Sequence, residues 1–273
     1  MKFSPIVVFL FLVCLTCSEV NAQIATIEAV GGDGYIDTTV TAQILGTTDL
    51  ATHGFSLGLS HDPTILAIDA LTDVRPGAVV SAVNGDSGPD FFEINIAPAG
   101  GTGLTIACIT DLFSPFDFLP PMDSSPLIEI DYRILPTAVV GSSSPLEFTS
   151  ALGSPAVQTV LVMELAEVTP AMISGLILVT EPHFIRGDLN HNGSVTLLDG
   201  VLLLYRVSGL EAPGSCSDAD DINDDGVLTL GDAVYLFQYM FTGGAPIPGS
   251  DGSCGPDQTG DDDLDCMEFG FCG

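Results

Sequence analysis

The sequence predicts a mainly β sandwich, followed by a small all-α module built from two loop–helix repeats. Three observations support this division. Short segments with alternating apolar and polar residues run from about Ile24 to Val179. The stretch GDLNHNGSVTLLDG, residues 187–200, returns as DDINDDGVLTLGDA at 220–233, 33 residues later. Four of the five cysteines beyond position 22 follow the first of these copies.

The chain is expected to have five parts. Its first residues combine Lys2, an apolar run and the small-residue ending Val20-Asn21-Ala22, which is typical of a secretory signal peptide. The character of the sequence changes again at Thr180, where a short connector precedes the repeats. We therefore expect a signal peptide (1–22), a β-sandwich (23–180), a linker (181–187), a double-loop module (188–243) and a tail rich in cysteine and aspartate (244–273).

The strands of the sandwich are predicted by a period of two residues. In YIDTTVTAQIL, residues 35–45, and in LIEIDYRIL, residues 127–135, apolar side chains alternate with polar ones, so that one face is buried and the other is wet. Similar short segments follow one another up to GLILVT, and Gly, Pro, Asp and Ser turns separate them. Many short strands without helical periodicity favour a β-sandwich.

The charge of the chain restricts its partners. The formal net charge is −31, with 36 acidic residues against 5 basic ones. Such a chain repels nucleic acid and anionic lipid, so neither is expected as a partner. An acidic excess also suits a solvated surface or the binding of divalent cations. Because no later segment is long and apolar enough to span a membrane, we expect a secreted protein, extracellular or associated with the cell surface.

The cysteines predict two disulfides near the C-terminus. In an oxidising compartment the four clustered cysteines can pair in three ways, which the sequence leaves open: Cys216, Cys254, Cys266 and Cys272. Cys108 lies on the apolar face of the segment LTIACITDL and is expected to be a buried free thiol.

The repeated motif predicts two calcium ions. Oxygen-bearing side chains stand at loop positions 1, 3, 5, 9 and 12, glycine stands at position 6, and position 7 offers a backbone carbonyl. Calcium takes six to eight oxygens, and this spacing wraps a loop around it. The second loop has three carboxylates and the first has two, so the second is expected to bind more tightly. The predicted ligands are Asp188, Asn190, Asn192, Ser194, Thr196 and Asp199 in the first loop, and Asp221, Asn223, Asp225, Val227, Thr229 and Asp232 in the second.

An apolar helix is expected after each loop. Each helix begins at a loop aspartate, where a carboxylate suits a helix N-terminus, and ends near Gly209 or Gly243. Helices this short are marginal alone, so we expect calcium to be part of the fold. Most of the apolar residues on these segments are expected to pack the two helices together: Val201, Leu202, Leu204, Tyr205, Val234, Leu236, Phe237 and Tyr239.

The two copies, GDLNHNGSVTLLDGVLLLY and DDINDDGVLTLGDAVYLF, resemble a type I dockerin module over about residues 187–243. The resemblance implies a calcium-dependent module of two F-hand-like loop–helix repeats that docks onto cohesin modules, commonly in extracellular assemblies for polysaccharide breakdown. Position 12 is Asp here, where the usual EF-hand loop has Glu. The resemblance places partner recognition at Leu197, Leu198, Leu204, Tyr205, Leu230, Gly231, Phe237 and Gln238, which favour an apolar interface.

The sandwich is similar to cohesin and related carbohydrate-binding modules over roughly residues 24–180. The segment GFSLGLSHDPTILAIDAL resembles a cohesin strand that ends in a Tyr-Asp-Pro turn, with His61 in the place of the tyrosine. The resemblance implies a jelly-roll β-sandwich. It would let this chain form cohesin–dockerin contacts with its own copies or with another protein. A generic secreted sandwich is the alternative.

Three functions follow from these patterns. We expect a noncatalytic extracellular assembly protein. Carbohydrate binding through the sandwich is the first alternative, although the chain has no Trp, and Phe113, Phe116 and Phe118 either form an exposed aromatic loop or pack over the sandwich edge. A glycoside hydrolase, or an accessory to one, is the second alternative. It would need two carboxylates across a scissile bond, and Asp90, Glu93, Asp111, Glu129 and Asp131 stand in no recognisable catalytic motif.

Overall fold

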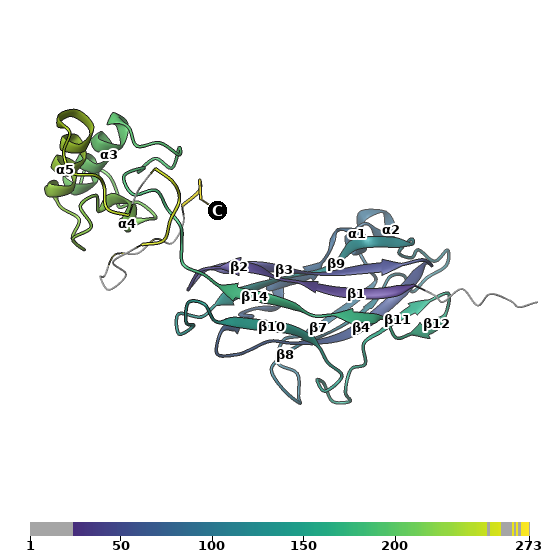
Figure 1. Cartoon of the computed structure of the whole chain (residues 1–273). Coiled ribbons are helices and arrows are strands. Elements are labelled where there is room, and N and C mark those ends of the chain that lie inside the picture. Colours follow the sequence, from purple (N-terminus) through teal and green to yellow (C-terminus); the bar gives the residue numbers. More distant parts are fainter. Residues whose placement is uncertain (1–23, 250–251, 258–263, 265, 267–268, 273) are drawn as a thin grey trace, which may run out of the picture.

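The computed structural model describes residues 24–249, 252–257, 264, 266 and 269–272 of the chain. The expected signal peptide lies outside these residues, as does much of the acidic part of the tail. Figure 1 shows two parts, a β-sandwich and a separate group of helices beyond the end of the sandwich where β14 leads out.

The first sheet of the sandwich has β13, β1, β3, β9 and β5 in that order, and β6 also pairs with β9. The neighbours are antiparallel except β1 and β13, which run parallel. Within the described residues its strands are β1 (Ala25–Val30), β3 (Thr39–Thr48), β5 (Leu66–Ala67), β6 (Val74–Pro76), β9 (Met122–Ile134) and β13 (Ala171–Ile173).

The second sheet has β12, β11, β4, β10, β14 and β2 in that order, with β8 beside β4 and β7 beside β8. Only β14 and β2 are parallel among its described pairs. Its strands are β2 (Gly32–Gly34), β4 (Thr52–Ser60), β7 (Phe91–Asn95), β8 (Gly103–Ile109), β10 (Ser143–Phe148), β11 (Val160–Met163), β12 (Ala166–Val168) and β14 (Gly175–Val179). The predicted mainly β fold with two sheets is confirmed.

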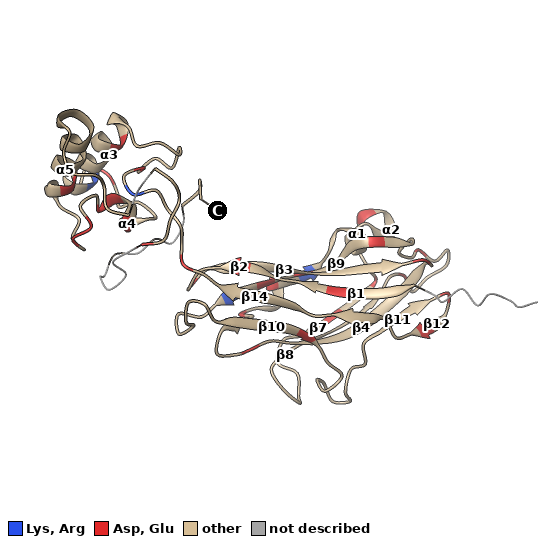
Figure 2. Ribbon diagram, in the orientation of Figure 1, with Lys and Arg blue, Asp and Glu red and all other residues tan. Residues whose placement is uncertain are grey.

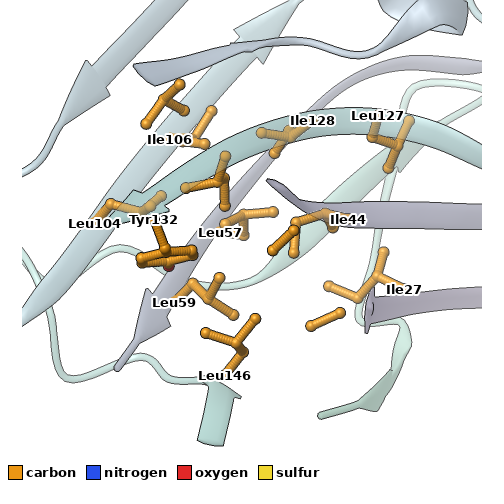
Figure 3. Packing of buried hydrophobic residues seen from close by; sticks show 14 of the residues in the cluster. Ile27, Ile44, Leu57, Leu59, Leu104, Ile106, Leu127, Ile128, Tyr132 and Leu146 are labelled. Carbon is orange, nitrogen blue, oxygen red and sulfur yellow. The ribbon is translucent and has the colours of Figure 1, made fainter. Parts of the chain in front are cut away.

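The core lies between the two sheets. The period-two pattern of the sequence predicts the buried face of β9, where Ile128, Ile130, Tyr132 and Ile134 are all fully buried. Figure 3 shows side chains from both sheets meeting in one layer, among them Leu57 of β4. Burial of this apolar surface is the main force that holds the sheets face to face.

Two short helices and a 3₁₀ turn depart from the expected run of strands. They are η1 (Leu71–Asp73), α1 (Ala78–Ser81) and α2 (Val83–Asp86), which lie between β5 and β7. Val80 and Val83 are buried against the core, so tertiary contacts stabilise helical turns too short to show a helical period in the sequence.

The C-terminal module contains α3 (Leu197–Val207), α4 (Ser217–Asp220) and α5 (Leu230–Thr242). The core between the helices contains Leu203, Ala233 and Leu236, which are fully buried. Leu202, Leu204 and Phe237 pack against this core while partly exposed. Three residues expected to pack there, Tyr205, Val234 and Tyr239, are instead 43–49% exposed, because the buried stripe of each helix is narrower than its apolar stretch.

The module begins before the expected boundary. Phe184, Ile185 and Arg186, which fall in the expected linker, are 1–4% exposed. Phe184 and Ile185 form a second small core with Phe269 of the tail and with both cysteines of one disulfide. The connector is thus short, and residues from before and after the repeats pack together.

Candidate metal centre and docking surface

The first position of each loop is a buried aspartate that receives the same hydrogen bond. The Gly193 N–H donates to Asp188 at 2.7 Å, and the Gly226 N–H donates to Asp221 at 2.8 Å. The two glycines have φ of 84° and 77°, in the left-handed region where a Cβ is strained. Position 6 therefore turns each loop back over the carboxylate at position 1.

The last position of each loop is an aspartate in the first turn of a helix. The Thr196 N–H donates to Asp199 at 2.7 Å, and the Thr229 N–H donates to Asp232 at 2.8 Å. These threonines are the N-cap residues of α3 and α5. Each carboxylate, 0% exposed, therefore satisfies an N–H at a helix start and also offers an oxygen toward the loop.

The third position joins the two ends of each loop. The Asn190 N–H donates to Asp199 at 3.2 Å, and the Asn223 N–H donates to Asp232 at 3.3 Å. The side chain of Asn223 donates to the Asp225 carboxylate at 2.8 Å. The side chain of Asn190, by contrast, has both amide atoms buried without a hydrogen-bond partner. A cation in the first loop would give that amide oxygen a partner.

Positions 5 and 7 are linked in both loops. The Ser194 N–H donates to the Asn192 side chain at 3.0 Å, and the Val227 N–H donates to the Asp225 carboxylate at 3.1 Å. Ser194 and Val227 have exposed side chains, which suits a position whose expected contribution is a backbone carbonyl.

The charges of the second loop suit a divalent cation. Burial raises the pKa of Asp221 to about 6, and the neighbouring Asp232 carboxylate adds to this increase, because two negative groups in a dry site repel. Among the described residues no group of three or more His, Cys, Asp or Glu side chains is placed to hold a metal. The three carboxylates predicted as ligands in the second loop, those of Asp221, Asp225 and Asp232, are therefore not gathered as such a group in the structure. The predicted sets also use amides, hydroxyls and carbonyls, which are ligands that calcium takes.

Arg206 links the two repeats, a contact that the sequence analysis did not anticipate. Its guanidinium donates to both oxygens of Asp220, at 2.6 and 2.9 Å, and to the carbonyl of Leu189 at 3.2 Å. The side chain of Asp220 is 1% exposed, and its burial raises its pKa to about 6, although Arg206 opposes the increase. Arg206 lies on α3, beside the first loop, and Asp220 directly precedes the second loop, so this ion pair fixes one repeat against the other.

The expected partner-binding residues divide into two groups. Leu197, Leu198, Tyr205 and Leu230 are 49–57% exposed, and Gly231 and Gln238 are also exposed. Leu204 and Phe237 are half-buried and belong to the packing between the helices. The starts of α3 and α5 therefore present leucines to solvent.

One disulfide ties the tail to the module, and a second closes a loop within the tail. The structure pairs Cys216 with Cys266 and Cys254 with Cys272, one of the three pairings that the sequence left open. The fifth cysteine, Cys108, is a buried free thiol whose burial raises its pKa to about 12. A thiol in that state is a poor nucleophile at neutral pH.

The loop between β8 and β9 carries exposed aromatic side chains. Phe113, Phe116 and Phe118 are 72%, 58% and 42% exposed, which corresponds to the exposed-loop alternative. Asp111 holds the loop, since it accepts hydrogen bonds from the N–H groups of Phe113 and Asp117, both at 2.8 Å. The aromatic rings are thus presented on a fixed backbone.

The carboxylates considered for catalysis on β9 are in ion pairs. Arg75 lies 2.9 Å from Glu129 and 2.6 Å from Asp131, and this pairing lowers the pKa of Asp131. Figure 2 shows how few basic residues stand among the acidic ones in both parts of the molecule.

Comparisons with known proteins found similarity to solved structures only. No protein-family model matches the chain, and no curated protein matches it. The sixth cohesin of scaffoldin B from Acetivibrio cellulolyticus, solved with a dockerin mutant, is similar with 12% identity and a TM-score of 0.45, over 57% of this chain and 99% of that chain. A non-cellulosomal cohesin from Archaeoglobus fulgidus has 14% identity and a TM-score of 0.39, over 57% and 91% of the two chains. The protein CaCohA2 from Clostridium acetobutylicum has 17% identity and a TM-score of 0.43, also over 57% and 91%. Among the described residues of this chain, no helix has the length and apolar character needed to cross a membrane.

Proposed function

We propose that this chain is a noncatalytic, secreted assembly protein whose C-terminal module binds two calcium ions and then docks onto a cohesin-type module. The observation that supports it most is the matched pair of loops. In both, the aspartates at positions 1 and 12 receive the same backbone hydrogen bonds, from position 6 and from positions 3 and 9. The same hydrogen-bond pattern occurs in two loops that lie 33 residues apart. This repetition favours a shared binding geometry over two turns that are alike by chance.

Each loop would hold its ion through residues spaced along the turn. The ligands would be the side chains at positions 1, 3, 5, 9 and 12 and the carbonyl at position 7. A bound calcium ion supplies positive charge that offsets the buried carboxylates. Asp199 and Asp232 also hold the starts of α3 and α5, so the occupancy of a loop fixes where its helix begins. Leu197, Leu198 and Leu230 stand at those helix starts and would form the apolar surface for the partner.

The sandwich would serve as the receptor part. Its resemblance to cohesin modules suggests that copies of this chain, or relatives of it, link head to tail in an extracellular or cell-surface assembly, which in the family commonly serves polysaccharide breakdown. Such a contact joins unlike surfaces and forms chains unless geometry closes it. The partner module is thus expected on a second copy or on another protein.

The proposal is tested on the mature chain by calcium titration calorimetry and by sedimentation velocity, in calcium and in excess EDTA. We expect two ions bound per chain. Faster-sedimenting species that appear only in calcium would place the partner on a second copy. Uptake of two ions by a chain that stays monomeric would place the partner on another protein. A chain that takes up no calcium would refute the proposal.

Carbohydrate binding by the sandwich is a second candidate, favoured by the exposed rings of Phe113 and Phe116. Aromatic faces pack against the C–H surface of a sugar ring, and a fixed loop lowers the entropy lost on binding. Affinity electrophoresis in gels that contain soluble polysaccharides tests it. Retardation that disappears in the Phe113→Ala and Phe116→Ala variants would establish this function, and unretarded migration in every polysaccharide would exclude it.

A further inference from the structure

The C-terminal tail turns back over the double-loop module. Phe184, before the first loop, and Gly255, in the tail, exchange two backbone hydrogen bonds of 2.9 and 3.0 Å. The disulfide between Cys216 and Cys266 fixes a second point of the tail beside the short helix that precedes the second loop. The tail is thereby held against the same body that carries both loops.

A buried arginine connects the tail to the second loop. The Arg186 guanidinium donates to the backbone carbonyl of Asp221 at 2.6 Å and to that of Asp218 at 2.8 Å. It lies 2.8 Å from the Asp224 carboxylate, and it also pairs with Asp257 of the tail. Asp224 occupies position 4 of the loop with a φ of 60°. Arg186 therefore fixes the turn of the loop and leaves the carboxylate of Asp221 available.

Two aromatic rings of the tail cover the first loop. The Phe269 ring lies 4.3 Å from the His191 ring, centroid to centroid. The Phe271 ring lies on Gly193, where an added Cβ would stand 2.5 Å from the Phe271 Cζ. His191 and Gly193 are positions 4 and 6 of the loop and both have left-handed backbone, with φ of 56° and 84°. The rings thus cover the two residues whose left-handed backbone shapes the turn.

We propose that the tail positions both cation-binding loops. Asp257 of the tail and Arg186, which precedes the first loop, are positioning residues for the second loop. Phe269 and Phe271 of the tail are positioning residues for the first loop. The inference depends on the proposed calcium binding. A loop must bring several oxygens to one point, and contacts that fix its turn beforehand reduce the entropy lost on binding. None of the four residues is an expected ligand, so their effect acts through loop geometry.

The test follows each site separately in the full mature chain, through the amide NMR signals of Gly193 and Gly226 during a calcium titration. We expect Asp257→Asn to weaken calcium binding about tenfold at Gly226 and to leave it unchanged at Gly193. Phe271→Ala should do the reverse. The matched controls lie on the sandwich: Asp69→Asn, which also removes a carboxylate paired with an arginine, and Phe91→Ala, which also removes a partly exposed ring.

If the tail had only a structural role, each variant would lower the calcium affinity of both loops together. That result would overturn the proposal, and so would unchanged affinities in both variants. If neither glycine signal of the wild-type protein responds to calcium, the proposed calcium binding itself fails. Phe271 is 53% exposed, so the Phe271→Ala variant should fold. This variant therefore tests the proposal even if Asp257→Asn does not fold.

Discussion

The ring of Phe237 on α5 covers Gly200 on α3 so closely that a Cβ at Gly200 would lie 2.4 Å from the ring. Gly200 is buried on the side of α3 that contacts α5, and Phe237 is half-buried against it. The absence of a side chain at position 200 therefore sets the approach of the two helices. Because one of the two repeated loops ends at the start of each helix, this contact also sets the distance between the loops.

Gly200→Ala is expected to destabilise the C-terminal module by about 1–3 kcal/mol, since the new methyl group must displace the ring. This loss outweighs the gain of up to about 1 kcal/mol that alanine brings within a helix. Urea unfolding followed by far-ultraviolet circular dichroism measures the change. The double variant Gly200→Ala with Phe237→Leu is the control. It should recover part of the loss, and a purely additive result would show that the two residues do not interact.

The sequence predicted those features that depend on residues close together in the chain. The alternation in 127–135 predicted the buried face of β9, because a strand's period is local. The loop spacing likewise predicted a wrapped loop, and N–H groups within that loop donate to Asp188 and Asp199. The ligand assignment itself stays a prediction.

Contacts between distant segments could not be predicted in this way. The pairing of Arg186 with Asp257 joins residues 71 positions apart, and no local pattern marks either of them. The exposure of Val234 was also missed, since an apolar helix stretch does not reveal which of its residues a neighbouring helix will cover. The disulfides also join distant segments, so the sequence left three possible pairings open.

The two proposed calcium loops are expected to differ in affinity. The second loop has three carboxylates, of Asp221, Asp225 and Asp232, whereas the first has only those of Asp188 and Asp199. More negative charge at the ligand positions increases calcium affinity. Calorimetry of Asp188→Ala and Asp221→Ala checks this, because each variant retains one intact loop. Tighter residual binding in Asp188→Ala is expected, and tighter residual binding in Asp221→Ala would show that charge does not decide the order.

Calcium binding to the second loop is expected to weaken as the pH falls below about 6. Burial, as the main cause, raises the pKa of Asp221 from 3.8 to about 6. Protons therefore compete with calcium for this carboxylate below pH 6, and affinity should fall by up to about tenfold per pH unit there.

The calcium-free module should respond to pH in the opposite direction. A carboxyl group whose pKa is raised on folding favours the folded state when it is protonated, so stability should fall as the pH rises from about 4 to 6 and stay level above that. Asp220, whose pKa is also about 6, acts in the same sense. Thermal unfolding in EDTA at pH 4, 5, 6 and 7 measures this. A stability that increases over this range would contradict the assigned pKa values.

Arg206→Met is expected to cost about 3–5 kcal/mol, because it leaves the carboxylate of Asp220 buried without its counter-charge. The loss should be smaller near pH 5 than at pH 7, since the unpaired Asp220 is then more often protonated and neutral. The comparison variant Arg206→Met with Asp220→Asn removes both charges, and it should regain much of the stability. Urea unfolding at both pH values provides the measurement. An equal loss in the single and double variants would mean that Arg206 stabilises the module through its contact with the Leu189 carbonyl, and not through the charge of Asp220.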